Sequence, residues 1–157
     1  MRVLVVAVGR VKGVLESGVS EYEERARRYW KLEVAEVDAG APGRNPAPER
    51  VMEAEAERIL ARIPDGFTVV ALTRKGKGMG SRDLARVLEE HGIRAAPGVV
   101  FVLGGAFGLA PAVLDRAQWR ISVSPMTLPH EMARLVLAEQ LYRAGTILRG
   151  EPYHKGA

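Results

Sequence analysis

The chain of 157 residues contains no cysteine. A chain without cysteine has no disulfide framework, no thiol nucleophile and no cysteine-ligated zinc site. Histidine is scarce as well: His91, His130 and His154 are the three, and none has HExxH-type spacing, so we expect no metal site. The sequence also lacks a run of about 18 apolar residues and a signal-peptide layout, which predicts a cytoplasmic protein without a membrane span.

Three common catalytic signatures are missing. There is no G-x-S-x-G and no convincing Ser-His-Asp set, which argues against nucleophilic hydrolysis. The G-x-x-x-x-G-K-[ST] phosphate loop is absent too. A nicotinamide site needs G-x-G-x-x-G after the first strand, where Gly9 stands alone. A small cofactor held mainly by backbone groups of several loops fits the sequence better.

The composition is that of an ordinary globular protein, with 47% hydrophobic and 27% charged residues. At this length we expect one domain over residues 1–157, large enough to bury a core without disulfides or metal. The formal net charge of +4 permits a nucleic-acid partner without requiring one, because a basic protein can simply be soluble.

The most informative stretch is residues 99–109, VVFVLGGAFGL. Its apolar half predicts a strand that is buried on both faces, as in a parallel sheet. The glycines that follow leave the backbone bare for close approach to a ligand, and Pro111 suits the start of a helix. A second loop, residues 122–130 with the sequence SVSPMTLPH, stands between a short strand and a long helix. Two such loops at the carboxyl edge of a sheet predict a crevice for one small molecule.

Strands alternate with helices along the rest of the chain. Ser20 and Glu23 form an S-x-x-E pattern that predicts a capping box. The alternation predicts a mostly parallel, right-handed, three-layer α/β sandwich. The expected strands are residues 2–8, 32–37, 68–72, 99–103 and 119–123, and the expected helices are residues 18–30, 49–62, 81–91, one beginning near residue 111, and 130–148.

Residues 73–80, TRKGKGMG, read as a mobile loop. Its cations and glycines favour either contact with RNA phosphates or a flexible surface turn. Ser81 is expected to cap the following helix. His91 lies near the end of that helix, where we expect a dipole-favoured or merely exposed side chain.

The last helix and the tail after it carry further signals. Residues 130–148 are apolar around most of the helix, so a second partner is needed, either a homodimer or deeper burial within one chain. Tyr153 and His154 in the tail suit stacking on a base and proton transfer, although a tail of this kind is usually disordered.

These segments together resemble the RlmH-type family of SPOUT-class methyltransferases, which modify large-subunit ribosomal RNA. The resemblance runs nearly end to end. Its most specific parts are the last two of the matching segments, which are VVAVGRVK, SEYEERARRYW, VVALTRKGK, FVLGGAFGL, SVSPMTLPHEMARLVLAEQLYRA and RGEPYHK.

The resemblance implies an S-adenosylmethionine-dependent enzyme that methylates N3 of a pseudouridine in 23S RNA of the assembled ribosome, acting as a homodimer. It also implies a C-terminal trefoil knot, which periodicity alone does not predict. The cofactor contacts carried over by motif are Leu72, Gly104, Val123, Ser124, Pro125, Met126, Thr127 and Leu128.

Catalytic roles follow once that reaction is assumed. The N3 proton must leave as the nitrogen attacks, and a histidine is the base available near neutral pH, so His154 is the leading candidate. Tyr153 would stack on or hydrogen-bond the base. Arg143 would stabilise negative charge on the uracil carbonyls, or would simply pair with Glu139 one helical turn away. His130 more plausibly organises the cofactor loop.

Two other functions stay open at this point. The first is a ribosome-associated protein that binds RNA but not S-adenosylmethionine. The second is a SPOUT enzyme with another target, such as transfer RNA or a ribose oxygen.

Overall fold

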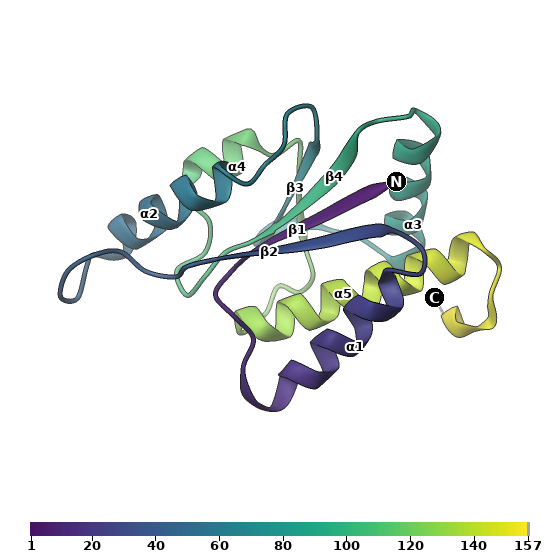
Figure 1. The fold of residues 1–157 in the computed structure, drawn as a ribbon, viewed down its shortest axis with the longest axis horizontal. Helices are drawn as coiled ribbons and strands as arrows, with labels where there is room; N and C mark the ends of the chain where they lie inside the picture. Colours follow the sequence, from purple (N-terminus) through teal and green to yellow (C-terminus); the bar gives the residue numbers. More distant parts are fainter. Residues whose placement is uncertain (157) are drawn as a thin grey trace.

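The computed structural model describes residues 1–156. Over these residues a five-stranded sheet forms in which every pairing is parallel, in the order β2-β1-β4-β3-β5 (Figure 1). The strands are β1 (Arg2–Val8), β2 (Lys31–Val37), β3 (Thr68–Gly78), β4 (Gly98–Leu103) and β5 (Trp119–Ser122). The helices are α1 (Glu16–Ala26), α2 (Pro48–Leu60), α3 (Ser81–Ile93), α4 (Pro111–Arg116) and α5 (His130–Leu148), with 3-10 turns η1 (Gly13–Leu15) and η2 (Pro152–His154).

The central strand β4 divides the core into two halves. All six of its residues are buried, and because side chains alternate along a strand, Phe101 faces one core and Val102 the other. Helices α1, α3 and α5 cover the first face of the sheet, and α2 and α4 cover the second (Figure 1). The predicted three-layer α/β sandwich with a parallel sheet is confirmed. Within residues 1–156, none of the helices is long and apolar enough to cross a bilayer.

Helix α5 is held in place by a buried ion cluster. The Arg134 side chain, 9% exposed, donates to Glu23 of α1 at 3.0 and 3.1 Å and to Glu36 of β2 at 2.6 Å. About two turns further along α5, the indole of Trp30 donates to the Leu141 carbonyl oxygen at 2.9 Å. Burying a guanidinium is tolerated only when its donors are satisfied, so this geometry fixes α5 against two other elements.

The ion cluster also explains why the predicted capping box is wrong. Helix α1 begins at Glu16, so Ser20 and Glu23 lie inside the helix and cap nothing. Glu23 is 7% exposed and serves instead as the partner of Arg134. The S-x-x-E pattern is present in the sequence, but the carboxylate of Glu23 forms an ion pair with Arg134 instead of capping a helix.

The prediction of a mobile loop over residues 73–80 is wrong as well. Strand β3 continues to Gly78 and pairs with β5 again after an irregularity between Leu72 and Lys77. At Gly76 the two backbones touch, because a Cβ there would lie 2.6 Å from the carbonyl carbon of Ile121. Glycine at this position therefore allows close strand approach rather than motion.

Two predictions about helix α3 also fail. Gly80 occupies the N-cap position, while Ser81 is the first helical residue and donates to Gln140 of α5 at 2.6 Å. His91 is not exposed but 9% accessible, with its ring nitrogens 3.1 Å from the Val87 carbonyl oxygen and from the Thr68 hydroxyl. It is a satisfied core histidine.

The buried cluster makes Arg134 a sensitive position for stability. Arg134→Ala leaves the buried Glu23 without its cation, so we expect the free energy of unfolding in urea to fall by about 3–5 kcal/mol. Arg27→Ala is the matched control, because its pair with Glu24 at 3.1 Å is largely exposed and should cost less than about 1 kcal/mol. Equal losses in the two variants would contradict the assignment.

Candidate functional site

A pocket of about 500 Å³ opens where β3, β4 and β5 end. Because the sheet is parallel, the carboxyl ends of these strands meet at one edge, where α/β folds bind ligands. The volume lies in the range of small-molecule sites, about 300–1,000 Å³. Its walls are the bulged part of β3, the glycine turn after β4 and the loop after β5.

The glycine turn after β4 has no room for side chains at Gly104 and Gly105. A Cβ on Gly104 would lie 2.8 Å from the carbonyl carbon of Gly108, and a Cβ on Gly105 would lie 3.0 Å from both Val8 and the carboxylate of Glu55. Gly108 has a φ of 83°, which side chains disfavour. The turn therefore presents backbone rather than side chains to the pocket.

The loop after β5 is braced by short polar contacts. The Ser122 hydroxyl donates to the Ser124 carbonyl oxygen at 2.9 Å, and the Met126 amide donates to the Ser124 hydroxyl at 2.9 Å. Arg74 of β3 reaches across the pocket and donates to Thr127 at 3.4 Å. These contacts hold the loop open in a defined shape before any ligand binds.

The structure brings together nearly all of the residues that the cofactor motif indicated. Pro125 lies in the loop after β5, but its side chain is exposed and does not line the pocket as described. His130 lines the pocket at the first residue of α5, against the backbone of Gly9. The expected residues that do line it are Leu72, Gly104, Val123, Ser124, Met126, Thr127 and Leu128.

Sequence analysis found Leu72 of β3 but missed the two cations that follow it and the aromatic residue in the glycine turn. Arg74 and Lys75 line the pocket because β3 bulges outward there, and Phe107 lines it at 49% exposure. The run of cations was visible in the sequence, but it was assigned to a mobile loop. Among residues 1–156, no group of three or more His, Asp or Glu side chains is placed to hold a metal ion.

The tail is ordered and packs on the other end of α5. Tyr153 donates to Glu139 at 3.0 Å, and its ring lies 4.5 Å from that of Tyr142. Arg143 donates to the same carboxylate oxygen of Glu139 at 2.6 and 2.9 Å, so the predicted pairing with Glu139 is present. Its guanidinium also lies over the Tyr153 ring, 4.9 Å from the ring centre. His154 has a buried Nδ1 that no described residue supplies with a hydrogen-bond partner.

These contacts set the protonation of the tail cluster. The hydrogen bond to Glu139 raises the pKa of Arg143, so this side chain stays a cation. Burial raises the pKa of Tyr153, and its hydrogen bonds to Tyr22 and Glu139 raise it further. Tyr153 is therefore a neutral hydrogen-bond donor throughout the physiological range.

The two halves of the expected site are not close to each other within one chain. The pocket adjoins His130 at the start of α5, whereas Tyr153 folds back on the second half of that helix and contacts Glu139 and Tyr142. At about 1.5 Å of rise per residue, Glu139 lies about 14 Å along α5 from His130. No methyl or proton can pass directly over that distance.

Comparison with known proteins gives three findings. A family described as "Predicted SPOUT methyltransferase" matches residues 1–154. Proteins named ribosomal RNA large subunit methyltransferase H are similar over nearly their whole length: the one from Gemmatimonas aurantiaca is 52% identical (99% of this chain, 100% of that protein), and the one from Limosilactobacillus fermentum is 45% identical (99% and 100%).

A solved structure supports the fold alone. The structure of a probable methylase family protein from Haemophilus influenzae matches with a TM-score of 0.52 over 98% of this chain and 70% of that chain. Its sequence is 14% identical.

The docking of the tail predicts a pH dependence. Tyr29 donates to Glu151 in the tail, and burial followed by this hydrogen bond raises the pKa of Tyr29 from 10.0 to about 12. The folded state thus keeps a proton that the unfolded chain loses, so stability should be full below pH 10 and should fall between pH 10 and 12.

Urea unfolding as a function of pH measures this effect. Tyr29→Phe should flatten the fall between pH 10 and 12, whereas Tyr142→Phe, which removes a neighbouring hydroxyl without touching Glu151, should retain it. An unchanged slope in Tyr29→Phe would show that the hydroxyl is not held as described.

Proposed function

We propose, from the premise that this chain belongs to the SPOUT methyltransferase family, that it methylates large-subunit ribosomal RNA. Enzymes of this family use S-adenosylmethionine as the methyl donor, and membership implies the trefoil-knotted fold. The observation that carries the proposal is the pocket at the carboxyl edge of the sheet, where the glycine turn and the braced loop converge. The names of the full-length relatives supply the class of RNA.

The pocket residues fit S-adenosylmethionine. The bare backbone around Gly104 leaves room for a flat purine and a ribose, and apolar side chains such as Leu72 and Leu128 flank it. Arg74 and Lys75 suit the carboxylate of the methionine part. When bound, S-adenosylmethionine supplies an electrophilic methyl group on a sulfonium.

We infer that the acceptor is N3 of a pseudouridine in 23S RNA of the assembled ribosome. His154 takes the N3 proton, since its Nδ1 is left without a partner by the described residues. Tyr153 stacks on or hydrogen-bonds the base. Glu139 fixes the plane of Arg143, which stabilises the negative charge on the uracil carbonyls.

We further propose that the working form is a cytoplasmic homodimer, with residues 1–157 of each copy acting as one domain. The separation along α5 supports this, because a second copy can bring its tail to the pocket of the first. Exposed apolar side chains flank the pocket end of α5: Val123 is 38% exposed, Met126 77% and Met132 39%. Such side chains suit a self-complementary interface.

Mass mapping of 23S RNA tests the reaction. Ribosomes lacking the modification, incubated with the protein and S-adenosylmethionine, should gain one methyl group on a pseudouridine, while free rRNA and transfer RNA should not. Gly104→Ala, whose Cβ would meet Gly108 at 2.8 Å, should reduce the rate about 100-fold by displacing the turn.

Gly92→Ala is the matched control for that variant. Its Cβ would meet open space on α3, so activity should be unchanged and the helix stabilised by about 0.5–1 kcal/mol. Ribosome binding without calorimetric uptake of S-adenosylmethionine would contradict the proposal and identify a binding protein instead. Methylation of transfer RNA alone would contradict the proposed substrate.

Mixing two inactive variants tests the shared site. His154→Ala disables the tail and Gly104→Ala the pocket, so random exchange of subunits should restore about a quarter of the wild-type activity. Half of the dimers are then mixed, and each has one intact site. A mixture of His154→Ala with Arg143→Ala, both in the cluster formed by the tail and α5, should restore nothing. Absence of recovery in the first mixture would show that each chain completes its own site.

A further inference from the structure

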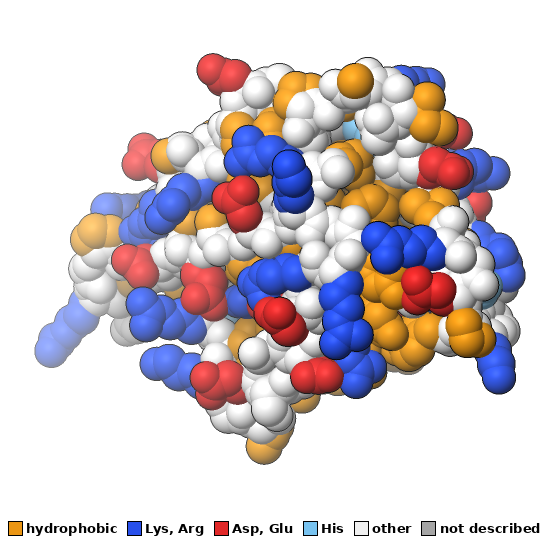
Figure 2. Space-filling model, turned by 45° about the vertical axis from the view of Figure 1, so that its right-hand side comes forward, with side chains coloured by type: hydrophobic (Ala, Val, Ile, Leu, Met, Phe, Trp, Pro, Cys, Tyr) orange, Lys and Arg blue, Asp and Glu red, His pale blue; other side chains and the backbone are white. Residues whose placement is uncertain are grey.

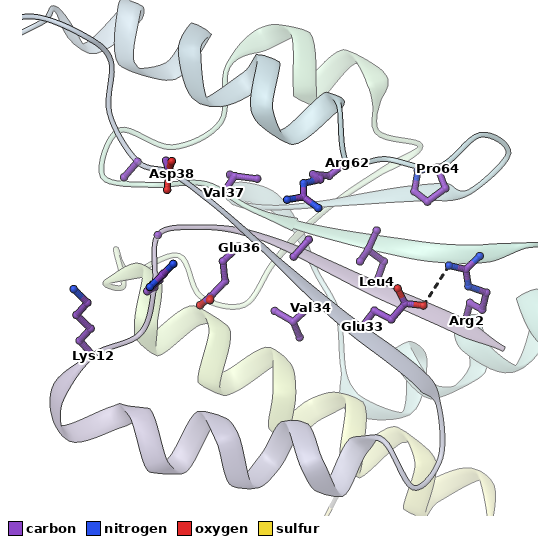
Figure 3. Close-up of a pocket in the computed structure, with 14 residues that line it drawn as sticks. Arg2, Leu4, Lys12, Glu33, Val34, Glu36, Val37, Asp38, Arg62 and Pro64 are labelled. Atoms are coloured by element: carbon purple, nitrogen blue, oxygen red, sulfur yellow. Dashed lines mark hydrogen bonds and ion pairs between the residues drawn. The ribbon is translucent and has the colours of Figure 1, made fainter.

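A second pocket follows the open edge of the sheet, apart from the glycine turn. It has a volume of about 750 Å³ and lies along β2, which is the edge strand of the sheet described for residues 1–156 (Figure 3). It extends from the carboxyl end of β1 to the start of the same strand. We refer to it as the β2 groove and define it by Arg2, Gly9, Arg10, Lys12, Asp38 and Arg62.

The acidic residues of the groove are mostly neutralised within the protein. Glu33 pairs with Arg2 at 3.2 Å, as the dashed line in Figure 3 shows, and Glu36 pairs with the buried Arg134 at 2.6 Å. Arg2 neutralises Glu33, whereas Arg134 is shared between Glu36 and Glu23, so that buried cluster keeps one net negative charge. Asp38 is the remaining carboxylate of the wall.

The cations of the groove are not neutralised in the same way. Arg10, Lys12 and Arg62 are exposed, and no ion pair joins any of them to another residue within the described part of the chain. Three cations against Asp38 and the one uncompensated charge of the Arg134 cluster leave the groove net positive by one charge. This local excess matters because, on the face drawn in Figure 2, cationic side chains are interspersed with acidic and hydrophobic ones.

The backbone of β2 adds further donors. The strand pairs with β1 from Lys31 to Val37, and its outer edge faces the groove. Every second peptide N–H of an edge strand points away from its partner strand, and these N–H groups can donate to anionic oxygens. Seven residues at about 3.3 Å each give a track of roughly 20 Å, which is long enough for several nucleotides.

The groove reaches the proposed catalytic pocket. Gly9 lines the groove, and a Cβ on it would lie 3.1 Å from Cε1 of His130, which lines the catalytic pocket. The two pockets therefore share a boundary at the carboxyl edge of the sheet. A polymer whose target nucleotide enters one pocket can continue directly into the other.

We propose that the β2 groove binds the sugar-phosphate backbone of the ribosomal RNA that flanks the target nucleotide. The inference rests on the proposed function, and it adds a binding surface that the methyl-transfer site does not include. Addition of a peptide strand to β2 is disfavoured, because Lys31, Glu33 and Glu36 place charges along that edge. Phosphate oxygens match both the cations and the peptide N–H groups.

A triple variant tests the groove: Arg10→Gln, Lys12→Gln and Arg62→Gln. All three side chains are exposed, so folding should be unaffected. The KM for ribosomes should rise about tenfold or more, while kcat and the calorimetric Kd for S-adenosylmethionine should stay within about twofold. The slope of log K against log salt for ribosome binding should become less steep by about 2 to 3, since three phosphate contacts are lost.

The matched control removes three cations elsewhere: Arg86→Gln, Arg94→Gln and Arg116→Gln, on or next to α3 and α4. It should leave KM and the salt slope near the wild-type values. Equal slopes in the two triple variants, or ribosome binding that is independent of salt, would overturn the proposal. Methylation by the wild-type protein tests the proposed function separately, so either proposal can fail without the other.

Discussion

The buried guanidinium of Arg134 is the constraint on which the rest of the site depends. It sits between Glu23 of α1 and Glu36 of β2, and a helix that carries such a cation has one position in which all of its donors are satisfied. Sliding α5 by a turn would strand two carboxylates near the core. The register of α5 is therefore set by charge, while its apolar residues, such as Leu137 and Leu141, supply the bulk of the packing.

Fixing α5 also fixes the positions of the two parts of the proposed site, the pocket and the tail. Its first residue, His130, borders the glycine-lined pocket, and Glu139 in its middle receives Tyr153 of the tail. Tyr29, which follows α1, holds Glu151 of the tail. A rigid helix keeps His130 and Glu139 about 14 Å apart and cannot bring them together. The ordering of the tail against its own helix thus favours use of the tail by a second copy, because a docked and pre-shaped tail loses little freedom when it meets a partner's pocket.

Much of this arrangement is written in local sequence. The apolar run before Gly104 and the loop with the sequence SVSPMTLPH predict a strand, a turn and a helix start, and the structure has all three. The predictions that were wrong concern residues whose role is set by a contact with a residue far away in the sequence. Glu23 resembled a cap because Arg134 lies 111 residues away. The glycines of residues 73–80 resembled a mobile loop because the partner strand that Gly76 touches, at Ile121, cannot be seen locally. His91 looked exposed because Thr68, which satisfies it, belongs to another element.

Parallel pairing explains why the catalytic pocket and the β2 groove lie side by side. All five strands of the described sheet point the same way, so the residues that follow β1 and those that follow β4 emerge at one edge. Gly9, the first residue after β1, has a φ of 82° and leaves no Cβ between the groove and His130. A side chain at this point would form a wall between the two pockets. Gly9 of the groove thus lies directly beside His130 of the pocket, and this proximity suits a substrate that is itself a continuous chain of charged units.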